Sequence, residues 1–114
     1  MSKKKRKKIA VDMSATLIHH GHIRLIKKEK KFGKVIVALT KDKEIIKYKG
    51  YIPELNYSQR KEIISAIRYV DKVIPSNFFL DEKFLDRHKI KLLIHGNDQN
   101  NKIDKKRVVT FKRT

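Results

Sequence analysis

The sequence predicts an α/β protein with a Rossmann-like, doubly wound parallel sheet of five strands and flanking helices. Short runs rich in β-branched residues alternate along the chain with segments of helical composition. These runs are apolar almost throughout, which is typical of parallel strands that are buried on both faces. The length of 114 residues, with 39% hydrophobic residues, suits one compact domain.

The first half of the chain contains one complete strand–helix–strand unit. Lys8–Met13 (KIAVDM) and Lys34–Thr40 (KVIVALT) are the two strands. Residues 22–33 between them (HIRLIKKEKKFG) have helix-forming composition, and Gly33 is expected to cap that helix at its carboxyl end.

The middle of the chain is expected to hold a loop and then a second helix. Residues 42–56 contain a glycine and a proline and are interpreted as the loop. Asn56 then caps a helix over residues 57–70, with Gln59 at the capping-box position. The helix is expected to bury one apolar stripe beneath the sheet, formed by Ile63, Ile64, Ile67 and Val70.

Shorter elements complete the sheet. The sequence predicts strands over residues 72–74, 90–95 and 107–111 and a short helix over residues 81–88. The domain is therefore expected to span residues 8–114, preceded by a disordered basic tail over residues 1–7.

The charge balance favours an anionic partner. Thirty Lys and Arg residues face twelve Asp and Glu, for a net charge of +18, which suits nucleic acid, an anionic membrane surface or small phosphorylated molecules. No apolar run has membrane-spanning length or follows the basic N-terminus as in a secretory signal, so we expect a cytoplasmic protein. The absence of cysteine excludes disulfides, a thiol nucleophile and cysteine-ligated zinc.

A cluster of histidines follows the first strand. His19, His20 and His22 surround Gly21 where a strand is expected to lead into a helix. Glycine allows phosphate oxygens to approach the backbone, and the N-terminus of a helix favours anions. His19 and His22 could donate hydrogen bonds to a phosphoryl group. A transition-metal site is the weaker alternative, because Asp12 is the only nearby carboxylate; ordinary histidines at a helix start are the other alternative.

Four segments, taken together, resemble a known family. They are LIHHGHIRLIKKEKKFGKVIVALTKD, YSQRKEIISAIRYVDKVIP, IKLLIHGND and RVVTFKRT, in that order. The chain resembles the cytidylyltransferase-like branch of the HxGH nucleotidyltransferases. Within that branch, VDMSATLIHHGHI looks most like domains associated with phosphoenolpyruvate mutases of phosphonate metabolism, and more distantly like glycerol-3-phosphate and choline-phosphate cytidylyltransferases.

The resemblance implies an enzyme that transfers a nucleoside monophosphate, usually from CTP with magnesium, to a small phosphate or phosphonate compound and releases pyrophosphate. It also implies a homodimer. Two alternatives stay open: an adenylyltransferase that uses ATP, and a catalytically impaired domain that binds nucleotide or nucleic acid.

The resemblance also implies roles for individual residues. The catalytic residues would be His19, His22, Lys49 and Arg113. The nucleotide-binding residues would be Met13, Ser14, Gly21, His22, Lys47, Arg60, Gly96, Asp98, Arg113 and Thr114. No side chain is assigned as a metal ligand. Independently of the resemblance, a cation in the first turn of a helix is disfavoured by the helix dipole, so the position of Arg60 suggests an anionic partner.

The chain also departs from the family pattern. Thr16 stands where the family usually has aspartate, and Gln99 stands where it has tryptophan. The family's last motif continues beyond the Arg113–Thr114 pair, so we expect that motif to be truncated here.

Overall fold

The computed structural model describes residues 7–15, 20–95 and 108–110. In chain order the elements are β1 (Lys8–Met13), α1 (His20–Glu29), β2 (Lys34–Thr40), α2 (Asp42–Lys49), α3 (Tyr57–Ser65), β3 (Lys72–Ser76), α4 (Glu82–Arg87), β4 (Leu92–His95) and β5 (Val108–Thr110).

The strands form one parallel sheet in the order β3-β2-β1-β4-β5. Four of them lie within residues 7–95, and the three-residue β5 pairs with β4. The chain first adds β2 and β3 on one side of β1 and then crosses to the other side with β4. The strand order therefore reverses between β1 and β4, where parallel sheets open a crevice at the carboxyl ends of their strands.

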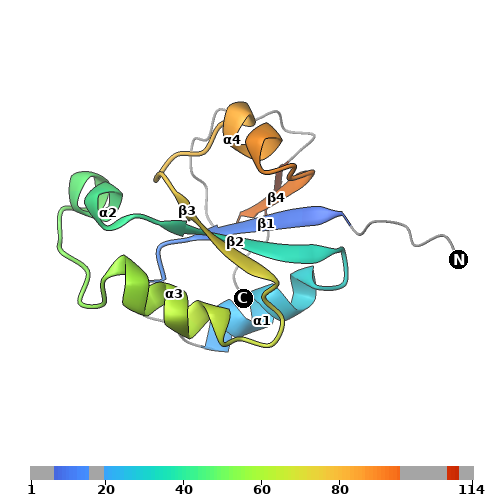
Figure 1. Ribbon diagram of the computed structural model, residues 1–114, viewed down its shortest axis with the longest axis horizontal. Coiled ribbons are helices and arrows are strands. Elements are labelled where there is room, and N and C mark those ends of the chain that lie inside the picture. Colours follow the sequence, from blue (N-terminus) through green and yellow to red (C-terminus); the bar gives the residue numbers. More distant parts are fainter. Residues whose placement is uncertain (1–6, 16–19, 96–107, 111–114) are drawn as a thin grey trace, which may run out of the picture.

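Helices cover both faces of the sheet (Figure 1), with α1 and α3 on one face and α4 on the other. Because side chains alternate along a strand, β1 and β2 supply both halves of the core. Ile26 of α1 and Ile64 of α3 belong to one buried cluster with Val11 and Val37. Leu85 of α4 belongs to the second cluster. The predicted doubly wound α/β fold is confirmed.

Two strands match the sequence prediction at both ends, namely β1 and β2. The strand expected over residues 72–74 continues to Ser76. The short helix expected over residues 81–88 is α4, whose N-cap Asp81 accepts a hydrogen bond from the Phe84 N–H at 2.9 Å.

The predicted loop over residues 42–56 is wrong in its first half, because Asp42–Lys49 forms α2. Acidic residues occupy its first turn and lysines its last turn, so both complement the helix dipole. Ile45 is fully buried, and Gly50 ends the helix in the left-handed conformation, with its N–H donating to the Ile46 carbonyl. The glycine is therefore a helix terminator and does not mark the middle of a loop.

The helix predicted over residues 57–70 is shorter than expected. α3 ends at Ser65, and the next residues form tighter turns in which the Ile67 N–H donates to the Ile64 carbonyl. The predicted apolar stripe is only partly correct: Ile64 is fully buried, whereas Ile63 is 42% exposed. Arg60 is the residue that lies four positions before Ile64 and shares its buried face.

The expected C-cap role of Gly33 is also wrong. α1 begins at His20 and ends at Glu29, four residues before the glycine. A Cβ atom at Gly33 would lie 2.2 Å from the Lys7 carbonyl oxygen, which accepts a hydrogen bond from the Lys34 N–H at 2.8 Å. Gly33 is required because two backbone segments pass very close to each other at the start of β1 and β2.

Within the described residues, none of the helices is both long enough and apolar enough to cross a membrane.

Candidate active site

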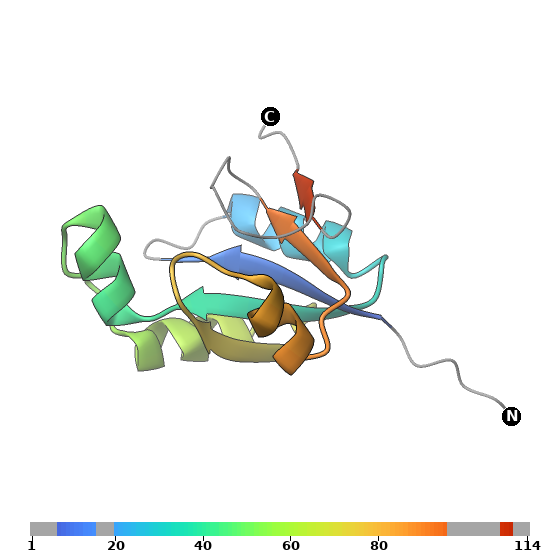
Figure 2. The same cartoon turned by 90° about the horizontal axis from the view of Figure 1, so that it is seen from above.

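The carboxyl ends of three neighbouring strands meet at one edge of the sheet (Figure 2). β1 ends at Met13, β2 at Thr40 and β3 at Ser76. The Thr40 hydroxyl donates to the Met13 carbonyl at 3.2 Å, and the Lys41 N–H donates to the Ser76 carbonyl at 3.0 Å. Met13 is buried at this edge, and its carbonyl accepts a hydrogen bond from the last residue of β2.

Two described residues, Ser14 and Ala15, follow the carboxyl end of β1. Ser14 is half-buried, and the buried Ala15 has a backbone φ of 51°, in the left-handed region that side chains rarely adopt. Gly21 and His22 are partly exposed and lie in the first turn of α1. That first turn contains no acidic residue. The backbone N–H groups and the positive end of the dipole of a helix favour an anion at such a position.

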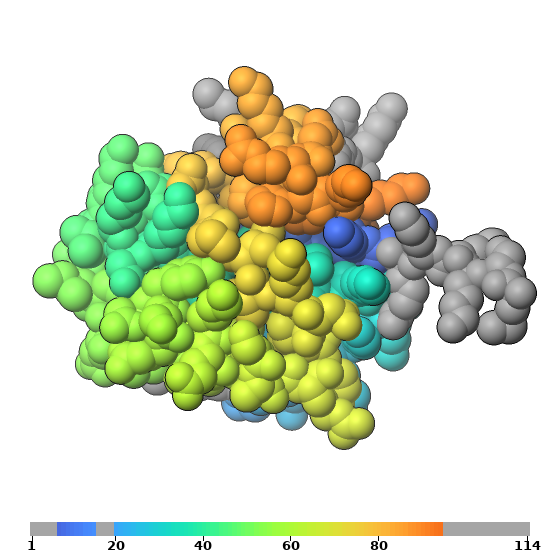
Figure 3. All heavy atoms as spheres, viewed as in Figure 1, coloured from blue at the N-terminus to red at the C-terminus, as the bar shows by residue number. Residues whose placement is uncertain are grey.

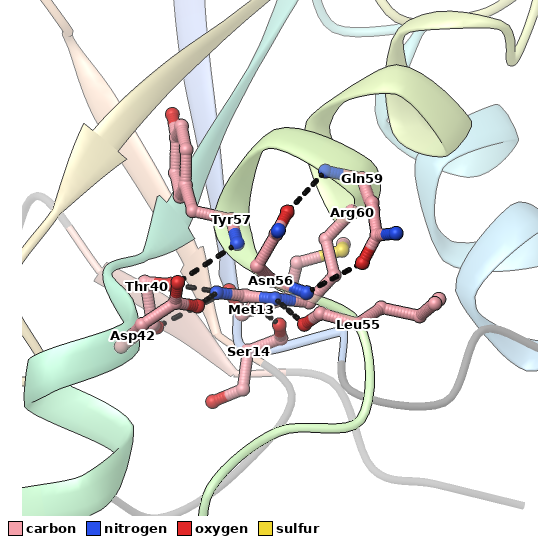
Figure 4. A network of polar contacts seen from close by, with 9 residues as sticks. All are labelled: Met13, Ser14, Thr40, Asp42, Leu55, Asn56, Tyr57, Gln59 and Arg60. Carbon is pink, nitrogen blue, oxygen red and sulfur yellow. Dashed lines mark hydrogen bonds and ion pairs between the residues drawn. The ribbon is translucent and has the colours of Figure 1, made fainter.

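Arg60 joins the segments at this edge (Figure 4). Its side chain has no exposed area, and it donates from Nε to the Leu55 carbonyl at 3.1 Å. One terminal nitrogen donates to the carbonyls of Ser14 at 2.6 Å and Thr40 at 2.9 Å. The other forms an ion pair with Asp42 at 2.6 Å. The anionic partner suggested by its position in the helix is therefore a carboxylate of the same chain.

Asp42 is a component of the site that the sequence interpretation missed. Its second carboxylate oxygen accepts a hydrogen bond from the Tyr57 N–H at 3.1 Å, so one side chain connects the start of α2 to the start of α3. The signal for it was present, since Asp42 lies two residues after the buried strand β2 and opens α2.

Tyr57 packs beside this network. Its ring centroid is 5.8 Å from the Arg60 guanidinium carbon, and its buried hydroxyl has no hydrogen-bond partner among the described residues. Burial raises the pKa of the Tyr57 hydroxyl, and the charge of Arg60 acts in the opposite direction. A capping box formed by Asn56 and Gln59 fixes the N-terminus of the same helix, as the sequence predicted.

Two lysines from the sequence prediction lie on α2. Lys47 and Lys49 are exposed in its last turn, where the helix dipole favours cations. The Lys47 ammonium is 5.1 Å from the ring centroid of Tyr48, which stacks on Phe78 at 5.2 Å. Figure 3 shows that α2 and α3 adjoin at one end of the molecule, and Asp42 connects the starts of the two helices.

The structure brings together part of the predicted site. Met13, Ser14 and Arg60 share one network, and Gly21 and His22 begin the helix that follows it. The remaining predicted site residues lie outside the described residues: His19, Gly96, Asp98, Arg113 and Thr114.

Comparison with known proteins identifies the family. A sequence profile described as "Cytidylyltransferase-like" matches residues 14–113, so the chain belongs to that family. It is 32% identical over 99 residues to "Glycerol-3-phosphate cytidylyltransferase" from Bacillus subtilis (strain 168), an overlap of 86% of this chain and 77% of that protein. It is 34% identical over 106 residues to the protein of the same name from Staphylococcus aureus (strain NCTC 8325 / PS 47), with 86% and 78% covered.

Other similar proteins differ in name and length. "Ethanolamine-phosphate cytidylyltransferase" from Mus musculus is 32% identical over 84 residues, which are 72% of this chain but only 20% of that protein. "FAD synthase" from Pyrococcus horikoshii is 35% identical over 88 residues, with 74% and 58% covered. The chain thus spans about a fifth of the mouse protein and more than half of the archaeal one.

A solved structure supports the fold. The "lipopolysaccharide core biosynthesis protein from Thermoplasma volcanium GSS1" matches with a TM-score of 0.78 at 20% identity, covering 96% of this chain and 98% of that one. At this identity the likeness concerns the fold alone.

Proposed function

We propose that this chain is a nucleotidyltransferase that transfers CMP from CTP to an oxygen of a small phosphate or phosphonate compound and releases pyrophosphate. The observation that carries the proposal is the position of Gly21 and His22, in the first turn of a helix that leaves the carboxyl end of β1 beside the strand-order reversal. Membership of the cytidylyltransferase-like family supplies the class of reaction. The relatives named for glycerol-3-phosphate and ethanolamine phosphate support an acceptor with a phosphate group.

In this reaction an acceptor oxygen attacks the α-phosphorus of the nucleotide. A new O–P bond forms, the bond from the α-phosphorus to the bridging oxygen breaks, and the electron pair leaves with pyrophosphate. No covalent bond to the enzyme is needed, so catalysis depends on positioning and on neutralising charge. His22 would donate a hydrogen bond to an α-phosphate oxygen, and the backbone N–H groups at the start of α1 would bind the same anion. We assign the same role to His19, and phosphate contacts to Lys47 and Lys49.

Magnesium fits the proposal as part of the nucleotide substrate. Mg²⁺ is usually held by substrate phosphates with one or two carboxylates rather than by a cage of protein ligands. Within the part of the chain that the structure describes, no three His, Asp or Glu side chains form such a cage. The Asp42 carboxylate already accepts from Arg60 and Tyr57. When bound, the ion would neutralise charge on the phosphates.

An adenylyltransferase is the second candidate function. FAD contains an adenine nucleotide, and FAD synthases are among the similar proteins. The phosphonate acceptor and the homodimer remain proposals that rest on the sequence resemblance.

Calorimetric titration with CTP and with ATP, each with magnesium, tests the proposal. We expect CTP to bind more tightly than ATP and His22→Ala to weaken that binding. His20→Ala is the matched control, because His20 is an exposed histidine in the same turn and has no assigned role. Tighter binding of ATP would favour the adenylyltransferase, and binding of neither nucleotide would contradict a nucleotide site.

A further inference from the structure

Protein groups at the edge where the proposed site lies engage most of the donors of the buried Arg60 side chain. A guanidinium has five N–H donors, and the four contacts to Leu55, Ser14, Thr40 and Asp42 occupy four of them. Its exposed area is zero. A ligand could reach this guanidinium only if the groups that bury it moved aside.

The acceptors come from segments that are distant in the sequence. Ser14 follows β1, Thr40 ends β2, Asp42 opens α2 and Leu55 precedes α3. One rigid, planar cation therefore fixes the ends of two strands relative to two helices. The ion pair with Asp42 holds the guanidinium in place, and Asp42 is itself fixed by the Tyr57 N–H.

The hydrogen bond from Arg60 to the Ser14 carbonyl lies next to a residue with an unfavourable backbone conformation. Ala15, the residue that follows, has a φ of 51° and is 5% exposed. A non-glycine residue keeps such a conformation only when its surroundings impose it. The 2.6 Å hydrogen bond from Arg60 to the Ser14 carbonyl is a contact that can impose it.

We propose that Arg60, held by Asp42, is a positioning residue that fixes the backbone turn at Ser14 and Ala15, and with it the direction in which the chain leaves β1 toward Gly21 and His22. This inference rests on the proposed nucleotidyl transfer for its effect on rate. It differs from the nucleotide-binding role that the sequence resemblance implies for Arg60, because the side chain acts on backbone carbonyls and does not contact substrate.

The two roles give different kinetics. If Arg60 positions the turn, Arg60→Lys should lower kcat by about 100-fold, the effect expected from a displacement of about 1 Å, while KM for CTP changes little. If Arg60 contacts the nucleotide, the same substitution should raise KM instead. Lysine keeps the charge but lacks the planar fork, so it cannot make the four contacts at once. Lys61→Met is the matched control, since Lys61 is an exposed cation one residue further along α3.

The Asp42→Asn variant tests whether the ion pair with Asp42 holds Arg60 in place. It should lower kcat in the same direction, and its effect should be smaller in the Arg60→Lys background than in the wild type, because both changes disturb one network. Independent, multiplicative effects of the two substitutions would overturn the proposal.

Hydrogen exchange gives a readout that does not depend on activity. In Arg60→Lys the peptide that contains Ser14 and Ala15 should exchange faster than in the wild type, while the peptide of α4, on the other face of the sheet, should be unchanged. Unchanged exchange around Ser14, or a raised KM with normal kcat, would overturn the positioning role. If wild-type protein turns over neither CTP nor ATP, the proposed function fails, and the exchange experiment still decides whether Arg60 holds the turn.

Discussion

Replacing Glu29 by glutamine is expected to remove a strong pH dependence from the free energy of unfolding. Glu29 is the last residue of α1, has no exposed area, and neither of its carboxylate oxygens has a hydrogen-bond partner among the described residues. Burial raises the pKa of the Glu29 carboxyl from its ordinary value of 4.5 to about 7, although the charge of Lys28 acts in the opposite direction. At neutral pH a protein with this side chain is therefore divided between a protonated and an ionised form.

The sign and size of the effect follow from proton linkage. Between pH 4.5 and about 7 the folded protein keeps the proton on Glu29, whereas the unfolded chain has released it. The contribution of Glu29 is fully favourable below pH 4.5 and is lost as the pH rises to about 7, so the free energy of unfolding falls across this window. A pKa difference of this size corresponds to about 3 kcal/mol.

Urea unfolding of the wild type and Glu29→Gln at pH 4.5, 6 and 8 measures this effect. Glutamine has nearly the same shape and does not titrate, so the stability of the variant relative to the wild type should rise by about 3 kcal/mol from the lowest to the highest pH. Burial and nearby cations lower the pKa of His88, but that dependence is common to both proteins and cancels in the difference.

Glu62→Gln is the control, because Glu62 is an exposed glutamate on α3. Its stability relative to the wild type should stay nearly constant with pH. Parallel pH curves for the wild type and Glu29→Gln would refute the reasoning, since they would mean that the Glu29 carboxyl titrates alike in the folded and unfolded states.

Three further substitutions test the local structure by urea unfolding. Gly33→Ala places a Cβ atom 2.2 Å from a backbone oxygen and should destabilise by about 1–3 kcal/mol through overpacking. Gly50→Ala meets no atom within 4 Å but keeps a φ of 76°, so it should cost about 1 kcal/mol through strain alone; a larger loss than for Gly33→Ala would contradict this order. Asn56→Ala removes the capping box and should cost about 1 kcal/mol, whereas Ser58→Ala in the same turn should change little; equal losses would argue against the cap.

The sequence predicted those parts of the fold that local chemistry determines. Continuous β-branched runs identified β1 and β2 to the residue, because most positions of both strands are buried, so the apolar runs stand out from the polar residues around them. The capping box at Asn56 was equally readable, since its two hydrogen bonds are made by residues three positions apart.

Contacts between segments that are distant in the sequence explain most of the features that the sequence did not predict. Gly33 was read as a helix cap because its need for space arises from Lys7, a residue far away in the sequence. The sequence did not predict α2 because this helix has only eight residues. Only one of them, Ile45, is buried, so the helix has no repeating apolar stripe. Arg60 was recognised as needing an anion, but nothing local could show that Asp42, eighteen positions away, provides it.

Pyrophosphate release measured with each nucleoside triphosphate and a panel of phosphate and phosphonate acceptors tests the central claim most directly. We predict release that requires both CTP and an acceptor with a free phosphate or phosphonate oxygen, that is lost in His22→Ala and that is retained in His20→Ala. Release with ATP in place of CTP would assign the chain to adenylyl transfer. Absence of release with every triphosphate, from a protein that binds CTP, would contradict the assignment of catalysis to this chain.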